Sequence, residues 1–166
     1  QGAIADHSKA IAISPQRASA YNNRGLAKRK SKDYQGAIAD FTNALEINPK
    51  DSKAYNNRGN AKDDLEDYQG AIADYNKAID INPQYAVAYS NRGNSKNRLG
   101  DLQGAIADFT KAIEIDPKFA SAYSNRGMSK YLLGDLKGAC DDARKAADLG
   151  DERSAERVKQ CLGMGF

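Results

Sequence analysis

A five-residue motif, tyrosine followed by asparagine or serine and then Asn-Arg-Gly, occurs four times in this chain at a constant spacing of 34 residues. Its tyrosines are Tyr21, Tyr55, Tyr89 and Tyr123, and the prolines that keep the same spacing are Pro15, Pro49, Pro83 and Pro117. A fixed period of this length is typical of a solenoid, in which each unit buries its apolar face against its neighbours. The period therefore predicts a stack of repeated units and favours a binding role over catalysis.

The composition is ordinary for a helical protein without a membrane span. Hydrophobic residues make up 40% of the chain and charged residues 28%, and the longest apolar stretches are too short to cross a bilayer. No signal peptide pattern is present. The chain starts at Gln1, without a methionine and partway through a repeat, which suggests a fragment of a longer protein. The localisation is therefore unknown: the cytoplasm is favoured, and a targeting segment could be missing from this fragment.

The two cysteines, Cys140 and Cys161, are too few for a disulfide framework. Cys140 occupies the position that Ile38 holds in an earlier unit, so we expect it to be a small buried hydrophobe. A reducing compartment fits this interpretation best.

Each full unit is predicted to contain two helices, which we name helix A and helix B. In the first full unit they span about Ala18–Lys30 and Tyr34–Ile47, and Pro49 prevents the second from continuing. Aspartates stand where the N-cap of each helix B belongs: Asp33, Asp67, Asp101 and Asp135. Gly100 and Gly134 are predicted left-handed stops for the preceding A helices. Glycines in helix A (Gly25 in the first unit) are expected to face alanines in helix B (Ala37), so that the two backbones approach closely.

These residues resemble the tetratricopeptide repeat family, whose pattern is W-x2-L-G-x2-Y, then A-x3-F, then P. The first full unit supplies Tyr21-x2-Arg24-Gly25-x2-Lys28, then Ala37-x3-Phe41, then Pro49. The resemblance implies an all-α fold, a right-handed superhelical solenoid of antiparallel helix pairs. The predicted divisions are helix B of a partial leading repeat at 1–17, repeats at 18–51, 52–85, 86–119 and 120–149, and a C-terminal capping helix with a loose end at 150–166.

The chain departs from the family pattern at two positions, where Arg24 and Lys28 replace the usual leucine and tyrosine. The same pairs recur in the later units: Arg58 and Lys62, Arg92 and Lys96, Arg126 and Lys130. A charge at a normally buried position needs a partner, and equally periodic aspartates are available at Asp40, Asp74, Asp108 and Asp142. We therefore predict an arginine–aspartate ladder that joins helix A to helix B. The alternative is that the arginines hold a ligand.

The two ends of the chain differ. The leading helix, Gly2 to about Ile13, has no helix A of its own, so its apolar surface invites another repeat or self-association. His7 lies at the ring position of Phe41 and is interpreted as packing. Near the other end, Asp151–Leu162 is predicted to form a capping helix. Its predicted apolar face holds Ala155, Val158 and Leu162, and its predicted solvating face holds Glu152, Arg153, Glu156, Arg157 and Lys159.

Charge divides unevenly between the helices. The A segments carry a net charge of +10, counted over residues 18–32, 52–66, 86–100 and 120–134. The B segments carry −9, counted over residues 1–14, 33–48, 67–82, 101–116 and 135–149. The family resemblance implies that A helices line the concave surface, which would then favour acidic ligands. Basic residues are densest in the first A segment, at Arg24, Lys28, Arg29, Lys30 and Lys32.

The resemblance also implies where a peptide would lie, because family members contact ligands through positions 2, 5, 6, 9, 12 and 13 of helix A. Position 1 is the first residue of each repeat: Ala18, Ser52, Ala86 and Ala120. We predict that ligand-binding residues at these positions are Asn22, Asn23, Lys53, Asn56, Asn57, Asn60, Asn91, Asn94, Arg98 and Asn125. Asparagine amides both donate and accept hydrogen bonds, so a row of them can hold a peptide backbone; the alternative is that they bridge neighbouring helices. Some relatives grip the C-terminal carboxylate of a chaperone, but this chain lacks the lysine and arginine that the clamp requires.

The leading hypothesis is a non-catalytic scaffold that binds a peptide or partner protein in the concave groove. One alternative is a nucleic-acid-binding helical repeat, although positions 5 and 6 barely vary between units, whereas a base-reading code must vary from unit to unit. The other alternative is a self-associating assembly module. No metal cluster, phosphate loop or nucleophile–base pair is evident in the sequence, so we expect no enzymatic activity, cofactor, metal or membrane partner.

Overall fold

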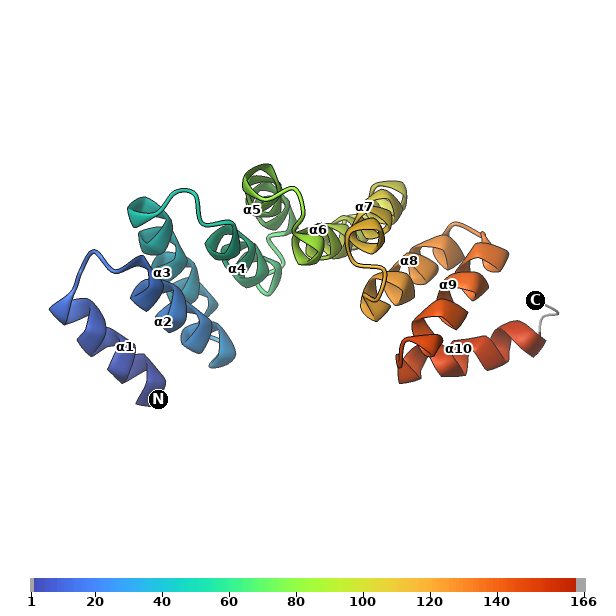
Figure 1. The fold of residues 1–166 in the computed structure, drawn as a ribbon, viewed down its shortest axis with the longest axis horizontal. Helices are drawn as coiled ribbons and strands as arrows, with labels where there is room; N and C mark the ends of the chain where they lie inside the picture. The colour runs from blue at the N-terminus through green and yellow to red at the C-terminus, as the bar shows by residue number, and fades with distance from the viewer. Residues whose placement is uncertain (1, 164–166) are drawn as a thin grey trace. The chain divides into compact units, whose positions relative to one another are not determined.

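The computed structural model describes residues 2–163, and these form ten α-helices and no β-strand. The helices are α1 (Gly2–Ile13), α2 (Ala18–Lys30), α3 (Tyr34–Ile47), α4 (Ser52–Asp63), α5 (Tyr68–Ile81), α6 (Ala86–Arg98), α7 (Leu102–Ile115), α8 (Ala120–Leu132), α9 (Leu136–Asp148) and α10 (Glu152–Gly163) (Figure 1). The predicted all-α fold is confirmed. None of the helices in this part of the chain is both long and apolar enough to cross a bilayer.

The chain divides into two compact units, residues 1–83 and 84–166. The first unit contains α1 to α5 and the second α6 to α10. The A helices are α2, α4, α6 and α8, and each packs against the B helix that follows it. Three-residue connections such as 31–33 turn the chain back, so the partners run antiparallel (Figure 1). Each of these helices begins where its sequence signals predict.

Capping fixes these boundaries. Asp33 accepts a hydrogen bond from the backbone N–H of Gly36 at 2.9 Å, as the predicted N-cap should. The other three predicted caps, Asp67, Asp101 and Asp135, make the same contact. Gly100 has φ of +81° and Gly134 +83°, which confirms the predicted left-handed stops. In the two earlier repeats this position holds Lys32 and Glu66, which adopt positive φ without being glycine.

An aromatic ring fills the centre of each of the first three repeats. Phe41, Tyr75 and Phe109 are fully buried in helix B. A Cβ added to Gly25 would lie 2.7 Å from Cε1 of Phe41, so glycine is needed there because the ring covers it. The ring of Phe41 is therefore the nearest neighbour of Gly25, a contact that the sequence analysis did not predict. In the fourth repeat a Cβ on Gly127 would instead meet the carbonyl oxygen of Ala139, as the sequence predicts.

The terminal helices only partly match expectation. Helix α1 has no buried residue, and Ile13 is 82% exposed. In α10, the packing face holds the buried Ser154 and Cys161, whereas Ala155 is exposed. The prediction for Ala155 is wrong: counted in steps of 34 residues, Ala155 falls at a position that is exposed in every A helix. The predicted loose end begins at Gly163, but Gly163 is the last residue of α10. The side chain of Leu162 and residues 164–166 lie outside the described part of the chain.

Cys140 of α9 and Cys161 of α10 form a disulfide, with their Cα atoms 5.8 Å apart. The expectation of an unpaired Cys140 is therefore corrected. Cys140 is buried as predicted, but the packing of α10 on α9 brings Cys161 opposite it. Because disulfides persist mainly in oxidising compartments, the argument for a reducing compartment no longer holds.

Candidate functional site

The arginines of the repeated motif lie against the periodic aspartates. Arg58 in α4 donates from Nε and NH2 to the two carboxylate oxygens of Asp74 in α5, at 2.9 and 2.7 Å. Lys62 Nζ reaches the same carboxylate at 2.8 Å. Equivalent arginine–aspartate–lysine clusters are Arg24–Asp40–Lys28, Arg92–Asp108–Lys96 and Arg126–Asp142–Lys130. The predicted ladder is confirmed, and each of its rungs joins helix A to helix B of the same repeat.

In three of these clusters the arginine also donates a hydrogen bond to the helix B that precedes its own repeat. The NH1 group of Arg58 donates to Thr42 of α3 at 3.1 Å, and Arg24 and Arg126 make the same type of contact with Ser8 and Thr110. The guanidinium carbon of Arg58 lies 5.5 Å from the ring centroid of Tyr55, one turn earlier in α4. These contacts show that the arginines hold three helices together.

In the first cluster, Arg24 and Asp40 stabilise each other's charged form. Burial alone would raise the pKa of Asp40, but hydrogen bonds from Arg24 and Lys28 outweigh it and lower that pKa below its usual value. The hydrogen bond to Asp40 raises the pKa of Arg24 in turn, despite partial burial. Each of the four clusters combines two basic side chains with one aspartate, a formal charge of +1. Because the basic side chains are 16–22% exposed, one net positive charge per repeat remains close to the surface.

The asparagine row links neighbouring A helices inside each unit. Asn57 Nδ2 of α4 donates to Asn22 Oδ1 of α2 at 3.1 Å. In the other unit, Asn125 Nδ2 of α8 donates to Asn94 Oδ1 of α6 at 2.9 Å. These amides do bridge helices, yet each still has further hydrogen-bonding groups, since an amide offers two donors and an acceptor with two lone pairs. Asn60 accepts a hydrogen bond from the buried Tyr75 hydroxyl at 2.8 Å.

The remaining predicted ligand contacts differ in accessibility. Asn23, Lys53 and Arg98 are exposed, and Asn91 is half-buried. Asn56 is only 3% exposed, so we leave it out of the proposed ligand contacts. In the dense basic segment, Arg29 pairs with Asp64, the C-cap residue of the next A helix, with 2.5 Å between Nε and Oδ2. The sequence analysis missed this interaction.

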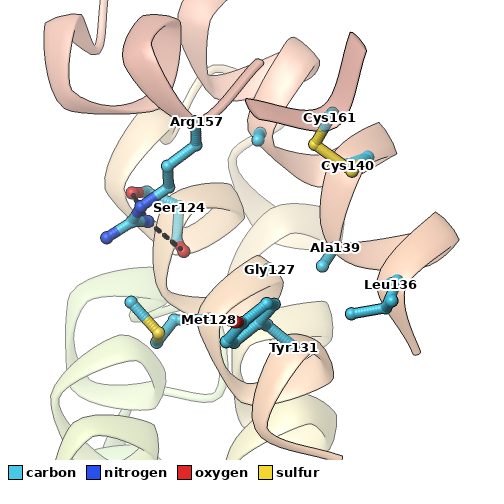
Figure 2. Close-up of a pocket in the computed structure, with 10 residues that line it drawn as sticks. Ser124, Gly127, Met128, Tyr131, Leu136, Ala139, Cys140, Arg157 and Cys161 are labelled. Atoms are coloured by element: carbon cyan, nitrogen blue, oxygen red, sulfur yellow. Dashed lines mark hydrogen bonds between the residues drawn. A yellow bond between two sulfur atoms is a disulfide. The ribbon is translucent and has the colours of Figure 1, made fainter. Parts of the chain in front are cut away.

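A second feature that the sequence analysis missed is a pocket between α8, α9 and α10 (Figure 2). Its volume is about 210 Å³, and its walls are mainly apolar. Met128 and Tyr131 of α8 line it together with Leu136 and Ala143 of α9, and the Cys140–Cys161 disulfide closes one side. Arg157 of α10 lies at its edge, where it donates to the hydroxyl of Ser124 at 3.2 Å. Arg157 is half-buried, so the prediction that it faces solvent is wrong.

The register of the helices agrees with comparisons to known proteins. A family model described as Tetratricopeptide repeat matches residues 18–51, 52–85 and 86–119, more than half of the chain. The chain belongs to the tetratricopeptide repeat (TPR) family. No curated protein sequence matches it significantly.

Several solved structures share the TPR fold. A structure of MamA protein is 25% identical with a TM-score of 0.80, covering 93% of this chain and 84% of its own. The first TPR of Spaghetti (RPAP3), solved with the HSP90 peptide SRMEEVD, is 27% identical with a TM-score of 0.70, covering 72% of this chain and 94% of its own. The Arabidopsis OM64 TPR domain is 27% identical with a TM-score of 0.67, covering 69% and 94%.

Proposed function

We propose that this chain is a non-catalytic scaffold that binds an acidic, extended segment of a partner protein along its A helices. The observation that carries the proposal is the repeated polar surface of those helices. In each repeat, asparagine amides lie next to an arginine–aspartate–lysine cluster that keeps one net positive charge. Amides can hold a peptide backbone without reading its side chains, and the positive charge favours carboxylates.

The ladder also narrows which residues are available to a ligand. The four motif arginines each bind a buried aspartate, so their role is structural. They attract an acidic ligand by their charge and do not contact it directly. Direct contacts are assigned to the accessible predicted residues of the A helices, which are Asn22, Asn23, Lys53, Asn57, Asn60, Asn91, Asn94, Arg98 and Asn125. Among these, Lys53 and Arg98 are exposed cations at opposite ends of their helices.

Related proteins support the acidic preference. The peptide bound to the first TPR of Spaghetti (RPAP3), SRMEEVD, carries two glutamates and an aspartate. That domain covers 72% of this chain at 27% identity. The chain lacks the lysine and arginine of the carboxylate clamp, however, so the proposed ligand is an internal acidic segment and not a free C-terminus.

The experiment is to capture partners from native lysate with three immobilised proteins, each with and without nuclease. They are the wild type, an Asn57→Ala/Asn91→Ala variant, and a Gln69→Ala/Gln103→Ala control that removes two exposed amides from B helices. We expect the asparagine variant to lose partners that the wild type and the control both retain, regardless of nuclease.

Two results would contradict the proposal. Capture that disappears with nuclease would support the nucleic-acid alternative, whose phosphate contacts would also make binding strongly salt-dependent. Partners retained equally by all three proteins would place the binding site away from the A helices. Self-association remains a separate prediction, motivated by the absence of buried residues in α1.

A further inference from the structure

The fourth repeat lacks the aromatic ring that fills the other three. The 34-residue spacing places Ala143 where Phe41, Tyr75 and Phe109 stand in the earlier repeats. Those rings are fully buried and lie against the glycine of their A helix, whereas the closest atoms to a Cβ on Gly127 are those of Ala139 and Asp142. The space that a ring occupies elsewhere is therefore not filled by the side chain at this position.

The pocket described above lies at this place. Both Gly127 and Ala143 line it. In the other repeats these two positions hold the glycine that the ring covers and the aromatic residue itself. Its volume of about 210 Å³ is ample for an aromatic ring, since a dry apolar cavity of about 150 Å³ is enough to bind benzene. Met128 is 38% exposed and Tyr131 56%, so the pocket is accessible from the surface of α8 (Figure 2).

The edge of the pocket carries a positive charge that no carboxylate neutralises directly. Arg157 donates to the hydroxyl and the backbone carbonyl of Ser124, at 3.2 and 3.4 Å. Within residues 2–163 it forms no salt bridge with an aspartate or glutamate. The acidic group that its charge affects is Asp151, whose pKa is lowered by hydrogen bonds from Ser154 and, to a smaller extent, by the charge of Arg157. Arg157 takes the position of the motif tyrosine in this register, which brings a cation to the side of an apolar pocket. A guanidinium in this setting favours a carboxylate near the bound ring.

We propose that this pocket binds a phenylalanine side chain of the partner segment, with an aspartate or glutamate beside it in the sequence facing Arg157. The ligand would supply the ring that Ala143 does not. This inference rests on the proposed function and adds a specificity site to it, because the amides of the A helices do not distinguish one side chain from another.

The test is a titration of the isotope-labelled full chain with blocked tetrapeptides, followed by amide chemical shifts. The probes are acetyl-Ser-Phe-Asp-Ser-amide, its Phe→Ala form and its Asp→Asn form. We expect the first peptide to shift signals of Met128 and Tyr131. Replacing phenylalanine by alanine should weaken binding at least about tenfold, because most of the ring is removed from water on binding. Replacing aspartate should weaken binding about threefold and reduce its salt dependence.

Variants of the chain identify the pocket as the site. Ala143→Phe restores the ring of the other repeats and should weaken binding of the phenylalanine peptide at least about tenfold, with thermal unfolding used to verify that the variant is folded. Met128→Asp places a negative charge at the exposed entrance and should have a similar effect, so it decides the question if Ala143→Phe does not fold. Leu99→Asp is its matched control, since Leu99 is an equally exposed apolar residue of the same unit that lies outside the proposed ligand contacts, and it should leave binding unchanged.

Several outcomes would overturn the inference. Equal binding of the phenylalanine and alanine peptides would show that no ring enters, and unchanged binding to both folded pocket variants would place the peptide elsewhere. If the phenylalanine peptide binds a chain truncated after Gly163 but not the full chain, residues 164–166 occupy the pocket. Self-association abolished by Ala143→Phe would assign the pocket to a second copy. If the tetrapeptides do not bind while Asn57→Ala/Asn91→Ala still loses its partners, this inference fails and the proposed function stands.

Discussion

The arginine–aspartate ladder makes a quantitative prediction about stability. Consider Arg58→Met and Asp74→Asn, alone and together. Asp74 is buried, accepts two hydrogen bonds from Arg58 and forms a salt bridge with Lys62. Removing Arg58 takes away both of these hydrogen bonds and leaves Asp74 with Lys62 as its one charged partner. We therefore expect a loss of about 3 kcal/mol, the lower end of the range for breaking a buried ion pair.

The double variant should lose less than the sum of the two single variants. Once Arg58 is gone, changing Asp74 to asparagine no longer breaks the two-point contact between them. We expect a coupling energy of about 2 kcal/mol, within the range measured for residues in direct contact. The matched control is Asp141→Asn with Arg144→Met, an ion pair at 3.2 Å whose side chains are 57% and 40% exposed. Its coupling should be indistinguishable from zero, because exposed pairs contribute little.

The measurement is equilibrium unfolding in urea, followed by far-ultraviolet circular dichroism, on all variants in parallel. Free energies are compared only between variants with the same m-value, because repeat proteins can unfold in parts. A coupling between Arg58 and Asp74 below about 0.5 kcal/mol would refute the reasoning, since desolvation would then cancel the attraction. The ladder would in that case be a consequence of helix packing and not one of its causes.

Two further predictions concern pH and the disulfide. The pKa of Asp40 is lower in the folded chain than in the unfolded chain, where it is about 3.9. The ionised Asp40 therefore stabilises the fold above about pH 3.9, and this stabilisation is lost as the pH falls below that value. Asp40→Asn should therefore lose less stability than the wild type between about pH 5 and about pH 2, measured as urea midpoints. The Cys140–Cys161 bond links residues 21 apart, so reduction should cost about 3 kcal/mol through loop entropy. A Cys140→Ser/Cys161→Ser variant should show that loss permanently and should not respond to reductant.

The sequence predicts most of this fold because each signal is repeated. One aspartate before a helix is weak evidence for an N-cap, but the same residue at Asp33 and at three equivalent positions is strong evidence. The ladder could be predicted for the same reason. Arg58 stands where the family pattern has leucine, and both Arg58 and Asp74 recur with the period of the repeat.

The errors lie where the chain departs from its own repeat. Ala155 and Arg157 were assigned to faces of α10 by polarity alone, although the 34-residue register places Ala155 among exposed positions and Arg157 at the motif tyrosine. The same register marks Ala143 as a missing ring, which is the signal that could have located the pocket. The Cys140–Cys161 pairing depends on how α10 packs on α9, and neither cysteine recurs in other repeats.

The central claim is that the A helices bind an acidic segment, and selection from a random dodecapeptide library against the immobilised chain tests it most directly. The account predicts that enriched peptides carry net negative charge, and that a photo-reactive copy cross-links to A helices α2, α4, α6 and α8. It also predicts that Asn57→Ala/Asn91→Ala fails to enrich them. Enrichment of neutral or basic peptides, or cross-links confined to the B helices, would contradict it.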